Sequence, residues 1–304
     1  MLKKAADYIY RYIPIIAFFF AIIYLINIDI KSFKINLPPF ILSVICLLSL
    51  FFFRVYIWFV FLRKFDPNIT FSVCIVGRFK FLLAKYIPGK FWQYLGAGLV
   101  QEKYTKISLI DGTVNAITFQ LVNNLSGFLI GSIGIVIYLE YTFIWLYIFL
   151  LIFVFTIIFY FLFREREIVS FIWLQKIKYL KKYTKTYSYK LPACADIFLL
   201  LLLQWLLLGA SYYLFFKAAF FNVGISTLFF QPLANNIGMI AIFAPGGLGV
   251  REGFMVFYLS RMGFHIEEAA LMAIISRFWF FLVEAVAFAI GLIVEKNMIY
   301  PKTI

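Results

Sequence analysis

The feature that most constrains this chain is a series of apolar stretches, each long enough to cross a lipid bilayer. A transmembrane helix needs about 20 predominantly apolar residues. Apolar residues make up 64% of the 304 residues and charged residues 14%, whereas a soluble domain is about half apolar and a quarter charged. We therefore expect an all-α, multi-pass membrane protein, with one integral membrane domain over residues 1–304. The six predicted full spans are 12–28, 38–62, 107–139, 141–163, 193–219 and 266–294.

Two further regions, 70–105 and 225–263, are apolar but are interrupted by proline and glycine. The first contains Pro88-Gly89 and the second Pro245-Gly246. Proline cannot continue a helix and glycine permits a sharp turn. Neither region is therefore predicted to be one continuous helix, and the two Pro-Gly pairs, with Gly247 and Gly249, are expected to supply helix ends and hinges.

Basic residues in the connecting segments predict the orientation. No Lys or Arg lies between Lys106 and Arg164, whereas the loop 164–192 contains eight. Basic loops remain in the cytoplasm, so we expect this loop and both termini to be cytoplasmic, although Lys31 and Lys34 then fall outside. Each interrupted region must enter and leave on one face, so the two are predicted to be re-entrant helical hairpins from opposite faces.

The order of these elements suggests an inverted repeat with units 38–139 and 193–294. The distance from the start of the first span to the proline is 50 residues in one unit (38 to 88) and 52 in the other (193 to 245). Inverted halves with broken helices at matching positions are typical of transporters that bind substrate near the bilayer midplane. A chance match of the two breaks is the alternative.

The first break is flanked by two lysines, Lys85 and Lys90. A free helix N-terminus and two ammonium groups form an anion site that suits a lipid phosphate. Alternatively, both lysines extend to the aqueous interface, as lysines near helix ends often do.

The second break contains three glycines that allow the backbone to approach a ligand or another helix, namely Gly246, Gly247 and Gly249. Arg251 and Glu252 follow directly, at a depth where ionisable residues are costly and often functional. An Arg–carboxylate pair that locks the hairpin is the structural alternative.

The last span carries Arg277 and Glu284 within an apolar run. They are about two helical turns apart, so each is expected to pair with another element. Glu252 is the predicted partner of Arg277, and Lys85 or Lys90 that of Glu284. Glu284 is also a candidate intramembrane carboxylate for ion coupling. In the span 107–139, small and polar residues recur on one helical face, for which close helix packing is favoured over cavity lining: Gln120, Asn124, Gly127, Gly131 and Gly134.

Other classes of function have little support in the sequence. One histidine and three scattered cysteines form no metal-ligand motif, and no catalytic triad is present. We therefore expect no metal site and no cofactor. The net charge is +14. We attribute it to Lys and Arg in cytoplasmic loops, where they meet anionic lipid headgroups, and not to nucleic-acid binding.

The two ordered motifs, KYIPGK at 85–90 and APGGLGVREG at 244–253, resemble those of the lysylphosphatidylglycerol synthase transmembrane region, also described as flippase-like membrane proteins. The resemblance extends over nearly the whole chain. It implies movement of lipids between leaflets of a bacterial cytoplasmic membrane, with envelope-biosynthesis enzymes as partners. The synthases also contain a soluble aminoacyl-transfer domain that no stretch of this sequence resembles, so synthesis of aminoacylated lipid is not implied.

These observations favour a translocase over an enzyme. The expected substrate is an anionic phospholipid or a polyisoprenyl-phosphate-linked lipid, with phosphate bound by Lys85, Lys90, Arg251 and Arg277 and with Glu252 positioning the arginines. Two alternatives are a membrane-embedded transferase acting on a lipid headgroup, with Glu252 or Glu284 as base, and a non-catalytic partner of a lipid or polysaccharide biosynthesis complex.

Overall fold

The structure is a computed structural model that describes residues 35–86, 91–138, 195–219, 223–241 and 244–298, and a few short pieces between 148 and 190. The predicted span 12–28 and the residues Pro88, Gly89 and Lys90 lie outside the described residues. So does most of the predicted span 141–163 and of the loop 164–192.

Four long apolar helices form the main body of the protein. They are α2 (Leu37–Leu62), α5 (Leu109–Tyr138), α7 (Ala195–Ala219) and α10 (Ile266–Asn297). All four are long and apolar enough to cross a bilayer. They coincide with four of the six predicted spans and confirm a multi-pass membrane protein.

Each interrupted region contains two short helices, one before and one after its Pro-Gly pair. The first contains α3 (Phe71–Phe79), the 3-10 turn η2 (Leu82–Tyr86) and α4 (Trp92–Tyr104). The second contains α8 (Thr227–Ile240), the 3-10 turn η5 (Pro245–Gly247) and α9 (Val250–Arg261). Two short helices replace one long helix in both regions, as the Pro-Gly pairs predict.

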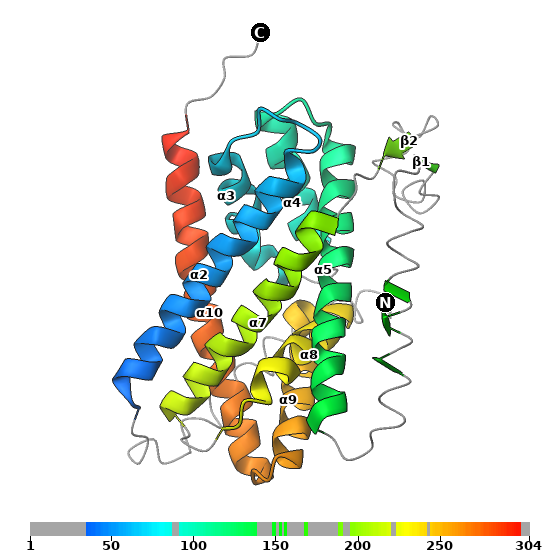
Figure 1. Cartoon of the computed structure of the whole chain (residues 1–304). Coiled ribbons are helices and arrows are strands. Elements are labelled where there is room, and N and C mark those ends of the chain that lie inside the picture. Colours follow the sequence, from blue (N-terminus) through cyan, green and yellow to red (C-terminus); the bar gives the residue numbers. More distant parts are fainter. Residues whose placement is uncertain are drawn as a thin grey trace, which may run out of the picture.

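Besides the helices, the described residues contain one short strand pair, which leaves the all-α fold class unchanged. Among the described residues, Glu167–Val169 (β1) and Ser188–Lys190 (β2) form an antiparallel pair in which Ile168 lies opposite Tyr189. Both strands fall in the basic loop 164–192, outside the helix bundle (Figure 1).

The two pairs of short helices lie at opposite ends of the bundle (Figure 1). Helices α3 and α4 lie at the end where α2 finishes and α5 begins, and α8 and α9 lie at the end where α7 finishes and α10 begins. Helix α2 packs along α7, α3 packs against α10, and α8 packs against α5. The turns η2 and η5 contact each other, so the residues just before the first Pro-Gly pair lie against the second break inside the bundle.

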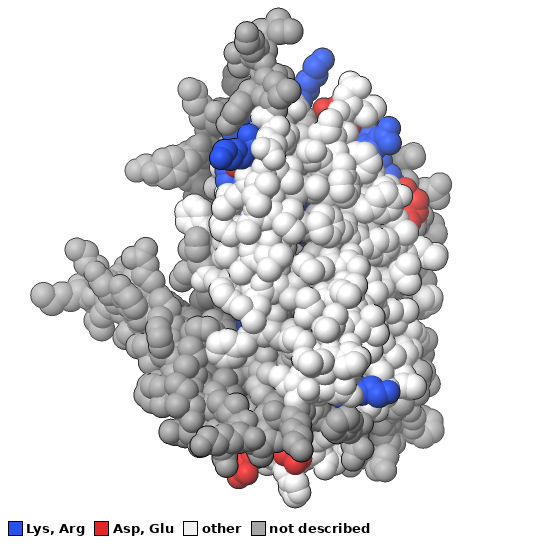
Figure 2. All heavy atoms as spheres, turned by 90° about the vertical axis from the view of Figure 1, so that its left-hand side faces the viewer, with Lys and Arg blue, Asp and Glu red and all other residues white. Residues whose placement is uncertain are grey.

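The outer surface is apolar over a broad band between the two ends. On the face that Figure 2 shows, this band is almost entirely uncharged, and Lys and Arg gather mainly toward one end. Leu199 of α7 and Leu282 of α10 are 71% and 64% exposed. Exposed leucines in such number are costly in water but are at no disadvantage against lipid tails.

Glycine allows the helices to approach closely in the interior. The expected glycine face of α5 packs against α8, because a Cβ at Gly131 would lie 2.6 Å from Leu233 Cβ and one at Gly134 would lie 2.2 Å from Phe229 Cβ. Close packing is therefore confirmed for these glycines.

A second close approach involves α7 and α8. Pro232 lies inside α8 and has no N–H, so it cannot donate to the carbonyl of Leu228 as a residue at that position normally would. Gly209 of α7 lies against this carbonyl, and a Cβ at position 209 would be 2.1 Å from its oxygen. Any larger residue at position 209 forces the backbones apart.

We expect Gly209→Ala to lower the free energy of unfolding by about 1–3 kcal/mol, the usual cost of overpacking. Gly253→Ala is the matched control, because a Cβ there meets no atom within 4 Å, and it should be neutral or stabilising by about 0.5–1 kcal/mol. Thermal unfolding of the purified protein in detergent measures both. Equal unfolding temperatures for the two variants would contradict the assigned contact.

Candidate functional site

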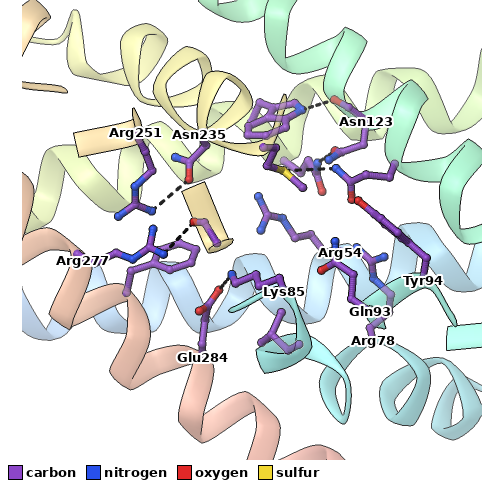
Figure 3. A pocket seen from close by; sticks show the side chains of 18 residues that line it. Arg54, Arg78, Lys85, Gln93, Tyr94, Asn123, Asn235, Arg251, Arg277 and Glu284 are labelled. Carbon is purple, nitrogen blue, oxygen red and sulfur yellow. Dashed lines mark hydrogen bonds and ion pairs between the residues drawn. The ribbon is translucent and has the colours of Figure 1, made fainter. Parts of the chain in front are cut away.

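A cavity of about 110 Å³ lies between the two breaks and is lined by residues from both interrupted regions and all four long helices. This is room for several water molecules or for a phosphate-sized group. Figure 3 shows the cavity with basic side chains on two sides. The charged residues that line it are Arg54, Arg78, Lys85, Arg251, Arg277 and Glu284.

Glu252 organises one side of the cavity. Its Oε1 accepts from Arg251 Nε at 3.1 Å and from Arg277 Nη1 at 3.4 Å. Its Oε2 accepts from the backbone N–H of Gly249 at 2.8 Å and so satisfies a free donor at the start of α9. One carboxylate therefore fixes both the helix end and two guanidinium groups, and the predicted Glu252–Arg277 pair is present.

The backbone of the second break completes this side. Arg277 Nη2 donates to the carbonyl of Gly246 at 2.9 Å, and Arg251 Nη1 donates to Asn235 Oδ1 at 3.3 Å. Gly246 has φ 59°, and a Cβ there would lie 2.5 Å from the ring of Tyr86 and 3.0 Å from Arg277 Nη2. Glycine is required because the chain both turns and is enclosed at this point.

Lys85 and Glu284 form the second predicted ion pair. Lys85 Nζ donates to Glu284 Oε1, and the hydroxyl of Tyr86 donates to Oε2 at 2.8 Å. Glu284 is fully buried. The pair joins the first interrupted region to α10, so Lys85 does not extend to the aqueous interface.

Two cavity arginines were not singled out from the sequence. Arg54 lies near the middle of α2 and Arg78 on α3. The guanidinium of Arg54 lies over Trp205 at 5.6 Å, and that of Arg78 lies over Trp58 and Phe119 at 5.5 and 5.3 Å. The signal was available for Arg54, because a charge in the centre of a predicted span is a candidate functional residue.

Uncharged polar groups line the remaining wall. The side chains of Gln120, Asn123, Gln204 and Asn235 reach it. Gln204 donates to Asn123 Oδ1, and Trp205 Nε1 donates to the carbonyl of Asn123 at 2.8 Å. Gln120 therefore lines the cavity, although the glycines on its helical face serve packing.

Some of the predicted site residues line the cavity in the structure and others do not. Lys85, Gly246, Arg251, Arg277 and Glu284 line one cavity, and Glu252 lies directly behind the arginines. Gly247 packs against Gly238 of α8, and Gly249 is exposed with open space around its Cα. The hinge role of Pro88, Gly89, Pro245 and these glycines stays a prediction, and so does the role of Lys90.

The electrostatics of the cavity favour an anion. Five basic side chains line it, and the carboxylates that contact them are Glu284 and Glu252. Burying unpaired cations in an apolar bundle is costly. Arginine also offers the planar fork of N–H donors that matches phosphate oxygens. Within the described residues, no three His, Cys, Asp or Glu side chains are arranged to hold a metal ion.

Glu284→Gln should lower the free energy of unfolding by about 3–5 kcal/mol, because it leaves the Lys85 ammonium, which is only 21% exposed, without a carboxylate. The double variant Lys85→Met, Glu284→Gln should recover part of this loss, because no charge is then left unpaired. Thermal unfolding in detergent measures both.

The matched control is the more exposed pair Lys64–Asp196, whose side chains are 23% and 56% exposed. Asp196→Asn should cost about 0–1 kcal/mol. If the double variant at the cavity is no more stable than Glu284→Gln alone, the two residues are not coupled as the structure indicates.

Comparison with known proteins gives one match. Residues 15–287 match the family described as lysylphosphatidylglycerol synthase TM region. No curated protein and no solved structure matches the chain.

Proposed function

This chain belongs to the lysylphosphatidylglycerol synthase TM region family, and we propose that it is a translocase that moves an anionic lipid between the leaflets of the membrane. The headgroup enters the basic cavity while the lipid tails remain in the surrounding hydrocarbon. The observation that carries the proposal is the excess of cationic side chains where the two helix breaks meet.

The arrangement of the helices supports alternating access. In this proposal the two pairs of short helices are re-entrant hairpins that enter from opposite faces, and the chain is an inverted repeat with units 38–139 and 193–294. The packing is reciprocal, because α2 contacts α7 while one short helix of each unit, α3 or α8, contacts the last long helix of the other. Transporters built from inverted repeats bind substrate where broken helices meet. The cytoplasmic location of the basic end stays a prediction from the distribution of Lys and Arg.

The contacts of the two carboxylates favour translocation over headgroup transfer. A transferase needs a base within hydrogen-bond reach of the substrate group that it deprotonates. Glu284 accepts from Lys85 and Tyr86, and Glu252 accepts from Arg251, Arg277 and the Gly249 N–H. Both carboxylates hold cations or a helix end in place, so their contacts are explained without a catalytic role. A non-catalytic scaffold would not require these buried charges.

The test is transport in proteoliposomes that contain fluorescent phosphatidylglycerol, with chemical quenching of the outer leaflet. The wild-type protein should make the inner-leaflet lipid accessible. Arg251→Gln combined with Arg277→Gln should slow this by at least about tenfold, because charge-assisted hydrogen bonds to the phosphate are lost.

Arg261→Gln is the matched control, because Arg261 is exposed on α9 and stacks on Phe257 away from the cavity. It should move lipid at the wild-type rate. Proteoliposomes that behave like protein-free vesicles would refute the proposal. Formation of a new lipid product, detected by mass spectrometry, would favour the transferase instead.

A further inference from the structure

The cations of the cavity fall into two groups that differ in their partners. Arg251 and Arg277 share Glu252, and Lys85 is paired with Glu284. Arg54 and Arg78 form no ion pair with a carboxylate of the described residues. Figure 3 shows Arg54 and Arg78 beside Gln93 and Tyr94, across the view from Arg251 and Arg277.

Aromatic rings hold Arg54 and Arg78 in place without neutralising them. Trp205 covers the face of the Arg54 guanidinium, and Trp58 and Phe119 lie against Arg78. Such stacking occupies the face of a guanidinium and leaves its N–H edge for hydrogen bonds. The two guanidiniums also repel each other. Within the part of the chain that the structure describes, neither guanidinium therefore forms an ion pair with a carboxylate, and Glu284 acts on Arg54 only from a distance.

Unsatisfied donors point to a missing acceptor in both groups. Arg54 Nε and Arg251 Nη2 are buried and have no hydrogen-bond partner among the described residues. Buried donors of this kind are rare and call for an acceptor. One such donor arises in each group, so each group has hydrogen-bonding capacity that its described neighbours do not use.

The charge of that acceptor follows from the groups that contact it. Arg54 and Arg78 contribute two unpaired positive charges, and Arg251 with Arg277 contributes one more beyond the charge of Glu252. A phosphodiester carries one negative charge, whereas a phosphomonoester carries about 1.5 to 2 at pH 7 and a diphosphate carries more. A phosphodiester alone leaves most of the excess charge uncompensated.

We propose that the ligand is a lipid whose terminal group is a phosphomonoester or a diphosphate, and that Arg54 and Arg78 select it over phosphodiester lipids. This inference rests on the proposed function and specifies its substrate class. Arg251 and Arg277 bind the phosphate in every case, and the second arginine group adds the preference for a higher charge.

The experiment is equilibrium binding to the whole protein in phosphatidylcholine nanodiscs. Phosphatidic acid and phosphatidylglycerol provide a monoester and a diester with the same tails, and farnesyl diphosphate provides a diphosphate. Inorganic phosphate and pyrophosphate provide the same groups without a tail. The wild-type protein should bind phosphatidic acid and farnesyl diphosphate at least about tenfold more tightly than phosphatidylglycerol.

Arg54→Gln and Arg78→Gln should reduce this ratio to about threefold or less, because the second group of N–H donors is then incomplete. Arg54→Lys and Arg78→Lys keep the charge and provide a second pair of variants if the Gln variants unfold; the ratio should then stay above that of the Gln variants. Arg63→Gln is the matched control, because Arg63 is exposed at the end of α2 and stacks on Phe59. It should leave the ratio unchanged.

Equal affinity of the wild-type protein for phosphatidic acid and phosphatidylglycerol would overturn this inference and leave the proposed function intact. Absence of binding to any anionic lipid would instead remove the proposed function itself. If inorganic pyrophosphate binds as tightly as farnesyl diphosphate, the lipid tail contributes nothing to binding. The inference that the ligand is a lipid would then be overturned.

Discussion

The architecture depends on how Glu252 holds positive charge inside an apolar bundle. This carboxylate accepts from Arg251, Arg277 and the first N–H of α9, so it joins the second break to α10. Without it, two guanidiniums would face each other in a medium that barely screens their repulsion. Arg251 Nη2 still has no hydrogen-bond partner among the described residues. The cavity therefore keeps an excess of positive charge for a ligand.

The second constraint is the meeting of two helix breaks. A continuous helix satisfies its own backbone and has nothing to offer an anion, whereas a broken helix exposes N–H and C=O groups within the bundle. Here the carbonyl of Gly246 fixes Arg277, and Lys85 and Tyr86 of the other break fix Glu284. Each break thus positions a charged residue of α10, which makes that helix the common wall of the site.

Much of this could be read from the sequence because lipid is a simple solvent. Hydrocarbon demands long apolar helices, so four spans and both interruptions follow from composition and from the Pro-Gly pairs. An isolated buried charge is so costly that Arg277 and Glu284 were each expected to have a partner, but the choice between Lys85 and Lys90 for Glu284 needed the structure. Arg78 is held by Trp58 and Phe119, and aromatic residues are too common in this chain to mark a partner, whereas Arg54 could have been found from its place inside a predicted span. The antiparallel strands β1 and β2 lie in a polar loop, where no such constraint applies.

The most direct test of the central claim is an experimental structure of the protein in a nanodisc with bound phosphatidic acid. The account predicts phosphate density inside the cavity, in contact with Arg54 or Arg78 on one side and with Arg251 on the other. Headgroup density confined to the basic end of the bundle, with the cavity filled only by water, would contradict it.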